Sequence, residues 1–220
     1  MRRRATSAFA ASVAAALLLA GCGGGDGKKG DDKIAGAQKG DASSSAAPSK
    51  AASGDENGPE MTFPKDFKMV LDWERPTDAK QAAALDGATN FVRGIRYGTV
   101  KQDSESAAYK YYSSPSGSAQ MYAKDQIEQN VKGGWTLYGT DRYTQPKVRV
   151  SDDGRRSSVT FCQDQSKMYS KEVKSGKVLR TKTSDRDYSL YEIVMELVPK
   201  SELWVATSIE VQGEAKQCKL

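Results

Sequence analysis

Apolar residues recur at helical spacing in the first half of the region that can fold. Ala84, Ala88, Phe91 and Ile95 follow one another at intervals of three and four, which predicts one apolar face of a helix over residues 78–97. We expect Thr77 to cap this helix and Gly98 to end it. A second, shorter helix is predicted at residues 105–112 and a third at residues 118–132, which two glycines then stop.

The apolar pattern changes to alternation after Trp135. Turn residues at positions 152–154 separate two strand-like stretches, and a second turn is predicted at residues 175–176. A short extended stretch, residues 68–73, precedes the helices. In a last strand at residues 204–211 we expect one face to carry Val205, Thr207, Ile209 and Val211. Helices followed by an antiparallel meander predict an α+β fold, with the helices on one face of the sheet.

This order of elements resembles the nuclear-transport-factor-2-like superfamily of cystatin-like α+β domains. The resemblance implies a cone, in which the helices lie in the concavity of a strongly curved antiparallel sheet. More narrowly, residues 83–98, the GGW at 133–135, the VTFCQD at 159–164 and the closing Cys218 resemble a family of uncharacterised actinobacterial lipoproteins. That resemblance implies a fold and a location, but no activity.

The first 22 residues have the features of an export signal. Three arginines at positions 2–4 precede an uncharged stretch, residues 5–20, which is short for a membrane span. The string LLLAGC resembles the lipobox of bacterial lipoproteins. It implies a signal peptide over residues 1–21 and a diacylglyceryl and palmitate anchor on Cys22, which would hold the chain on the outer face of the cell membrane. The alternative is a plain secretory signal with a chance cysteine.

A polar stretch separates this signal from the rest of the chain. Residues 23–60 contain no aromatic residue, and Ile34 is their only large aliphatic one, so they cannot bury enough apolar surface to fold. We interpret residues 22–60 as the lipidated cysteine and a disordered tether, and residues 61–220 as a single domain. Gly25, Gly27 and Gly30 match a dinucleotide-binding spacing, but a glycine-rich spacer explains them better, because no strand precedes them.

If Cys22 carries lipid, two cysteines remain. Cys162 and Cys218 would lie outside the cytosol, where disulfides persist, and we predict that they pair. Two free thiols are the alternative.

The chain contains no histidine, which removes the commonest general base and metal ligand. No nucleophile elbow, EF-hand or CxxC pair is present, so we expect no cofactor, no metal and no enzymatic activity. Enzymes with this fold can nevertheless use an Asp base and a Tyr donor. The candidate sets here are Asp141 with Tyr138 and Tyr143, and Asp164 with Tyr109 and Tyr112.

Several aromatic residues could line the mouth of the cone and hold an apolar or sugar-like ligand. They are Tyr109, Tyr111, Tyr112, Tyr122 and Trp135. The preferred alternative is that they fill the cone and seal the contact between helices and sheet.

The net charge of +5 for the whole chain is too small to indicate a nucleic-acid partner. A local basic run could meet an anionic cell-wall polymer or lipid headgroups, but the preferred alternative is that its lysines discourage edge-to-edge sheet aggregation. The run comprises Lys167, Lys171, Lys174, Lys177, Arg180, Lys182 and Arg186.

Three functions are compatible with these patterns. The first is a non-enzymatic module, anchored in the membrane by lipid, that binds an envelope protein or another cell-envelope component. The second is a small-molecule pocket protein, either binding or isomerase- or cyclase-like. A solute-binding lipoprotein is the third, but a single domain is short for the two lobes such proteins need.

Overall fold

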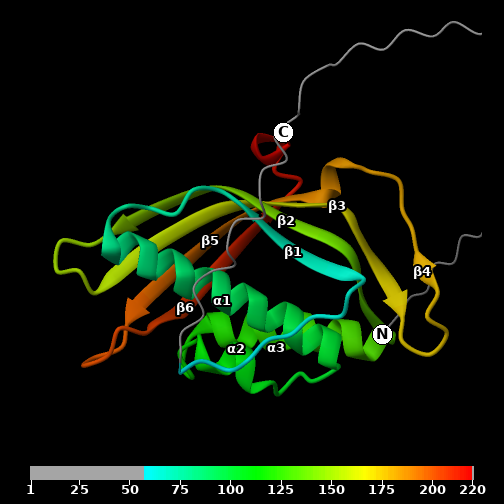
Figure 1. Cartoon of the computed structure of the whole chain (residues 1–220), viewed down its shortest axis with the longest axis horizontal. Helices are drawn as coiled ribbons and strands as arrows, with labels where there is room; N and C mark the ends of the chain where they lie inside the picture. The colour runs from blue at the N-terminus through cyan, green and yellow to red at the C-terminus, as the bar shows by residue number, and fades with distance from the viewer. Residues whose placement is uncertain (1–56, 220) are drawn as a thin grey trace, which may run out of the picture. The chain divides into compact units, whose positions relative to one another are not determined.

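The computed structural model describes residues 57–219, a single layer of helices packed on one sheet (Figure 1). The expected signal peptide, Cys22 and all but the end of the expected tether lie outside the described residues. The elements are β1 (Phe67–Asp72), α1 (Ala79–Lys101), α2 (Ala107–Tyr111), α3 (Ser118–Gly133), β2 (Trp135–Val150), β3 (Arg156–Glu172), β4 (Val178–Leu179), η1 (Asp185–Asp187), β5 (Tyr188–Leu197), β6 (Trp204–Gly213) and η2 (Lys216–Cys218).

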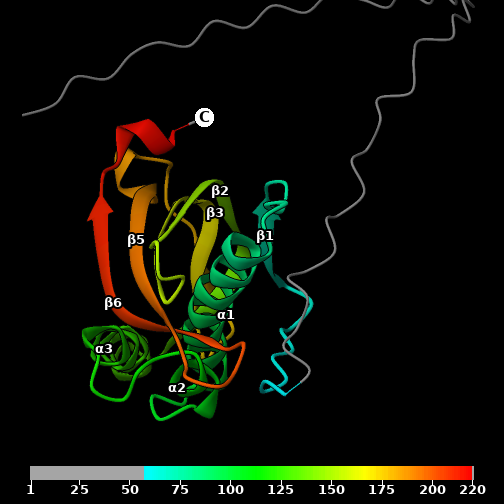
Figure 2. The same ribbon diagram turned by 90° about the vertical axis from the view of Figure 1, so that its left-hand side faces the viewer.

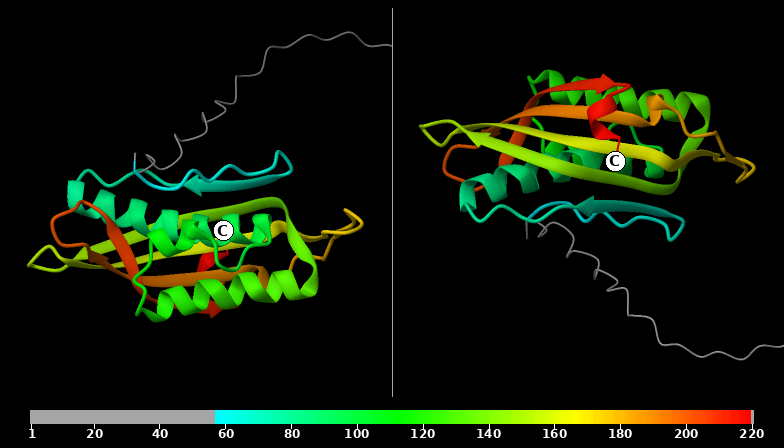
Figure 3. Two further views of the ribbon diagram at one scale, coloured as in Figure 1. Left: turned by 90° about the horizontal axis from the view of Figure 1, so that it is seen from below. Right: turned by 90° about the horizontal axis from the view of Figure 1, so that it is seen from above.

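The sheet has the order β1-β2-β3-β5-β6, with the short β4 paired to the far part of β3. The long strands curve around the helices, which cover the concave face (Figure 2), and the C-terminal η2 lies on the opposite face (Figure 3). The expected α+β architecture, with helices in the concavity of a curved antiparallel sheet, is therefore confirmed. One strand departs from the meander, because β1 pairs with β2 in parallel and forms an edge.

Helix α1 begins and ends at different residues from those expected. Asp78, not Thr77, is the N-cap, and its side chain accepts a hydrogen bond from the Gln81 amide at 2.9 Å. The helix passes through Gly98 and ends at Lys101, and the C-cap Gln102, with a φ of 58°, turns the chain. Gly98 remains helical because tertiary packing holds it: a Cβ there would lie 2.6 Å from the Ile127 side chain of α3.

The core lies between α1, α3 and the concave face of the sheet. Its largest fully buried apolar side chains come from the helices and the central strands, and include Leu85, Phe91, Ile127, Val159, Phe161, Ile193 and Met195. Both predicted hairpin turns are present, between β2 and β3 and between β3 and β4.

Strand β6 does not keep one face inward along its length. A shift of register opposite Val194 and Met195 inserts an extra residue, so Trp204 and Ala206 are buried near the start of the strand while Ile209 and Val211 pack on the core farther along. The expectation that Val205 shares a face with Ile209 is wrong, because a β-bulge reverses the alternation.

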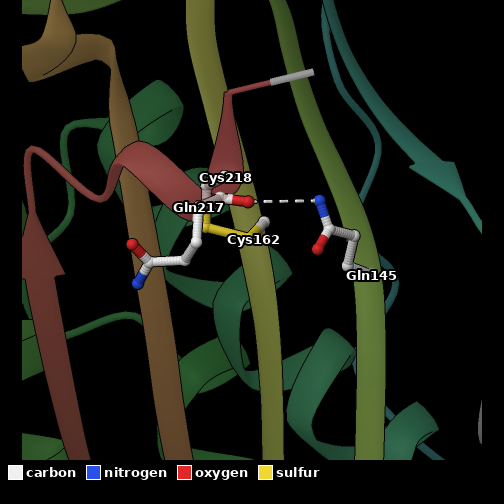
Figure 4. Close-up of a disulfide and its surroundings, with 4 residues drawn as sticks. All are labelled: Gln145, Cys162, Gln217 and Cys218. Atoms are coloured by element: carbon white, nitrogen blue, oxygen red, sulfur yellow. Dashed lines mark hydrogen bonds between the residues drawn. A yellow bond between two sulfur atoms is a disulfide. The ribbon is translucent and has the colours of Figure 1, made fainter.

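The expected disulfide is present and joins Cys162 of β3 to Cys218 of η2 (Figure 4). Beside it, the Gln145 side-chain amide of β2 donates a long hydrogen bond of 3.5 Å to the Gln217 carbonyl oxygen. Tyr188 and Ala215 bury the bridge in a small cluster on the convex face. The disulfide thus holds the end of the chain against the outside of the sheet.

Candidate functional site

An ion pair lies in the concavity, where the sequence placed a candidate base. Asp141 of β2 is 0% exposed, and its Oδ2 accepts a hydrogen bond from Arg96 Nε of α1 at 2.7 Å. The Tyr143 hydroxyl donates to the same oxygen at 2.6 Å, and the Gln163 amide donates to Oδ1 at 2.7 Å. Three side chains therefore donate hydrogen bonds to the carboxylate, and both of its oxygens accept at least one.

Local structure explains why these side chains meet. Asp141 and Tyr143 are two residues apart on β2 and so point to the same face. The register of β2 and β3 shifts next to Asp141, where β3 carries an extra residue. The Asp164 side chain accepts a hydrogen bond from the Ser166 amide at this bulge, at 2.8 Å. The second candidate base therefore has a structural role in shaping the strand.

The electrostatics of this cluster favour a fixed set of protonation states. Burial lowers the pKa of Arg96, but the interactions with Tyr143 and Asp141 outweigh it, so the pKa is raised and the guanidinium stays charged. Burial raises the pKa of Tyr143 and of Tyr191, so both phenols stay neutral. Burial likewise raises the pKa of Tyr122, whose hydroxyl interacts with Tyr191. The Asp141 carboxylate is thus buried, and three side chains of the same fold donate hydrogen bonds to it.

One atom of the cluster lacks a protein partner. Among residues 57–219, Arg96 Nη2 is buried without a hydrogen bond. The Nε of the same guanidinium donates to the Asp141 carboxylate at 2.7 Å.

The structure places the aromatic residues proposed for the mouth of the cone in different surroundings. Tyr109 is buried in the core, and its hydroxyl donates to the Ser104 carbonyl oxygen at 2.7 Å. Tyr112 is also buried, and Tyr122 is half-buried. Trp135 instead lies 41% exposed at the start of β2. For Tyr109 and Tyr112 the alternative interpretation holds, in which the aromatic side chains pack between the helices and the sheet.

Tyr138, the other proposed partner of Asp141, makes a different contact. The Arg180 guanidinium lies 5.4 Å from the Tyr138 ring centroid and 5.1 Å from that of Tyr169. One lysine of the basic run forms an ion pair within the domain, since Lys171 Nζ lies 2.7 Å from Asp66 Oδ2.

An open groove lies at the edge of the concavity, between α1, the residues after α2 and the loop joining β5 to β6. Its volume is about 570 Å³, and it is lined among others by Asn90, Tyr111, Tyr112, Ser201, Leu203 and Trp204. The rings of Tyr111 and Tyr112 meet edge to face at 4.9 Å. At one border Arg75 Nη2 contacts Asp86 Oδ2 at 2.6 Å. Aromatic surface with a few polar groups is typical of a ligand-binding groove.

Sequence reasoning found Asp141 and Tyr143 but missed Arg96, Gln163 and the groove. A signal for Arg96 was available: it follows Val92 by four residues and so places a charge on the apolar face of α1. Gln163 carries no such signal, because a polar residue within a strand is ordinary. The groove requires segments more than 80 residues apart in the chain, including Asn90 and Ser201.

Within residues 57–219, no group of three or more acidic or cysteine side chains is placed to hold a metal ion. The same residues form no helix that is long and apolar enough to cross a membrane.

No protein-family model matches this chain, and no curated protein matches its sequence. Solved structures of similar fold exist at low identity. The Bdellovibrio bacteriovorus protein Bd1075 is 14% identical, with a TM-score of 0.35; the match covers 57% of this chain and 40% of that one. This chain thus spans less than half of that protein.

Two smaller proteins are matched over nearly their whole length. An NTF2-like protein from Cytophaga hutchinsonii is 12% identical, with a TM-score of 0.37 and coverage of 59% of this chain and 93% of that one. A ketosteroid isomerase-like protein from Erwinia carotovora is 10% identical, with a TM-score of 0.39 and coverage of 62% and 97%. At these identities the similarity concerns the fold alone and gives no residue of this chain a catalytic or binding role.

Proposed function

We propose that this chain is a lipid-anchored protein of the outer face of the cell membrane that acts by binding and carries out no chemistry in its concavity. The proposal for the anchor rests on the export signal and the LLLAGC string ending at Cys22. The Cys162–Cys218 disulfide agrees with it, because such bonds persist outside the reducing cytosol.

The observation that carries the non-enzymatic part is the closure of Asp141. This inward acid is 0% exposed, and Arg96, Tyr143 and Gln163 occupy its oxygens. Opening the site to a substrate would leave a buried charge unpaired, which is strongly unfavourable. Binding would then take place on the outer surface, where the groove and the exposed residues lie.

Fatty-acid labelling of the full chain tests the anchor. An alkyne analogue of palmitate should label the wild type, and the label should disappear in Cys22→Ala, which should leave the membrane fraction. In cells stripped of their wall, added protease should digest the domain of the wild type without lysis. Label that persists in Cys22→Ala would refute the proposed anchor. A domain that the protease cannot digest would refute its location on the outer face of the membrane.

The groove favours a second candidate function, the binding of a small molecule. Its volume of about 570 Å³ lies within the usual range for such sites, roughly 300–1,000 Å³. Its aromatic rings and buried Asn90 amide suit a ligand with both a flat apolar face and polar groups, such as an amino sugar.

Thermal shift with N-acetylglucosamine oligomers as the probe tests this candidate. Ser201→Trp would place a large ring at the groove and should abolish any stabilisation by the probe. Ser118→Trp, at an exposed position on α3, is the matched control and should keep it. Equal stabilisation of both variants would place the probe elsewhere and remove the groove from consideration.

A further inference from the structure

Two exposed apolar residues lie on neighbouring segments at one end of the domain. Trp135 begins β2 and is 41% exposed, and Val173 follows β3 and is 47% exposed. The Val173 amide donates to the Gly134 carbonyl oxygen at 2.9 Å, which holds the two segments together. We call Trp135 and Val173 the apolar tip. It lies where α3 passes into β2 and β3 turns into β4, at the right-hand end of the domain in Figure 1.

Local contacts hold the apolar tip in place. The Trp135 ring lies against Gly133, where an added Cβ would be 2.7 Å from ring atom Cε3. The Gln102 side-chain amide donates to the Trp135 carbonyl oxygen at 2.9 Å. Hydrogen bonds between Glu172 and both Gly176 and Lys177 close the turn after β3. The tip is therefore ordered before it meets a partner, which lowers the entropic cost of binding.

Two lysines without an ion-pair partner lie in the turn beside Val173. Lys174 and Lys177 are exposed and form no ion pair within residues 57–219. Other nearby lysines are occupied, since Lys132 pairs with Glu128 at 2.6 Å and Lys171 pairs with Asp66 at 2.7 Å. The tip thus combines a tryptophan, a small aliphatic residue and two free ammonium groups.

We propose that the apolar tip docks on an anionic lipid surface, with Trp135 and Val173 entering the headgroup region and Lys174 and Lys177 contacting lipid phosphates. Tryptophan is enriched at membrane interfaces, and long lysine side chains reach from apolar surface to charged groups. An anionic wall polymer would satisfy the lysines but offers no apolar medium for Trp135. The exposed tryptophan therefore favours lipid.

This inference rests on the proposed lipid anchor, which would keep the tip close to a bilayer and raise its effective concentration. The chain from Cys22 to Asn57 could extend by roughly 120 Å, so its length does not limit contact. Two apolar residues alone bind a membrane weakly. Because the anchor keeps the domain at the membrane, this weak contact is enough to orient the domain.

Quenching by brominated lipids tests the proposal on the full lipidated chain. The lipidated protein is reconstituted into vesicles whose lipids carry brominated acyl chains. One set of vesicles contains half phosphatidylglycerol, and the other contains only phosphatidylcholine. The fluorescence that is lost in Trp135→Phe belongs to Trp135, and the fluorescence that remains belongs to Trp73 and Trp204. We expect blue-shifted, quenched Trp135 emission in the anionic vesicles alone. Chain that floats with these vesicles while Trp135 stays unquenched would overturn the proposal.

A second measurement separates the tip from the anchor. In full-length Cys22→Ser, which cannot be lipidated, binding to anionic vesicles should weaken by about 25-fold in Lys174→Ser/Lys177→Ser, since each basic residue near such a surface contributes about fivefold. Lys147→Ser/Lys200→Ser removes the same charge from exposed positions away from the tip and should leave binding within about threefold. Equal losses in the two pairs would overturn the proposal.

The apolar part has its own matched control. Trp135→Ser should weaken vesicle binding more than Met121→Ser, although Met121 is the more exposed residue at 69%. Binding to isolated cell wall that needs the lysines but survives Trp135→Ser would identify a wall polymer as the partner instead. A wild-type chain that carries no lipid but still passes these vesicle tests would contradict only the proposed anchor.

Discussion

Arg96 Nε lies 2.7 Å from Asp141 Oδ2, although the two residues are 45 positions apart and belong to a helix and a strand. This bond ties α1 to the concave face of the sheet at its most buried polar point. A single pair thus connects the packing of the helix layer to the closure of the concavity.

Removing one member of this pair should destabilise the domain strongly. Arg96→Met leaves Asp141 buried and uncompensated, so we expect the free energy of unfolding to fall by about 3–5 kcal/mol in urea titration. Arg149→Met, at an exposed position on β2, should change it by less than about 0.5 kcal/mol. A loss below about 1 kcal/mol in Arg96→Met would show that the ion pair does not hold α1 on the sheet.

The disulfide should contribute to stability by restricting the unfolded chain. For a bridge spanning 56 positions, the loop-entropy relation gives about 4 kcal/mol, which Cys162→Ala/Cys218→Ala should lose. Hydrogen exchange at residues 214–219 should speed up more than exchange in β5. Titration of the unfolded, unreduced wild type should detect neither thiol. Two reactive thiols from these cysteines would contradict the bridge.

Acid should weaken the contact between α2 and α3. Hydrogen bonds from Lys110 and Lys124 lower the pKa of Glu105 from 4.5 to about 2. A lowered folded-state pKa adds stability above the unfolded-state value, and this stability is lost as the pH falls from about 4.5 to about 2. In Glu105→Gln, unfolding free energy should fall less steeply over this range, whereas Glu74→Gln should resemble the wild type. An unchanged slope in Glu105→Gln would argue against these contacts.

Close packing of α1 on α2 should make one glycine irreplaceable. A Cβ at Gly94 would lie 2.7 Å from the backbone of Tyr109. Because backbone cannot move aside as a side chain can, Gly94→Ala should lower the melting temperature, with an unfolding free energy reduced by about 1–3 kcal/mol. Gly213→Ala has no atom within 4 Å of the added Cβ and serves as the control. Similar melting of both variants would disprove the tight contact.

Apolar spacing and turn residues predicted three helices, two hairpin turns and the α+β class, because apolar spacing reports which face of an element is buried and turn residues mark where a strand reverses. They predicted the ends less well: Gly98 remains within α1 because Ile127 packs against it. They also missed the parallel edge strand and the bulge in β6, which depend on pairing with a neighbouring strand.

The sequence by itself determined the three predicted helices, the two hairpin turns and the cysteine pair, since each follows from local spacing, turn residues or residue counts, and it offered Asp141 as one of two candidate acids. Only the tertiary structure decided what Asp141 does, because its partners come from positions 96, 143 and 163 on three different elements. The same holds for Trp135 and Val173, which become one exposed tip only when the ends of β2 and β3 meet. Spacing along the chain reports burial, whereas the identity of a side chain's partners depends on how distant segments pack.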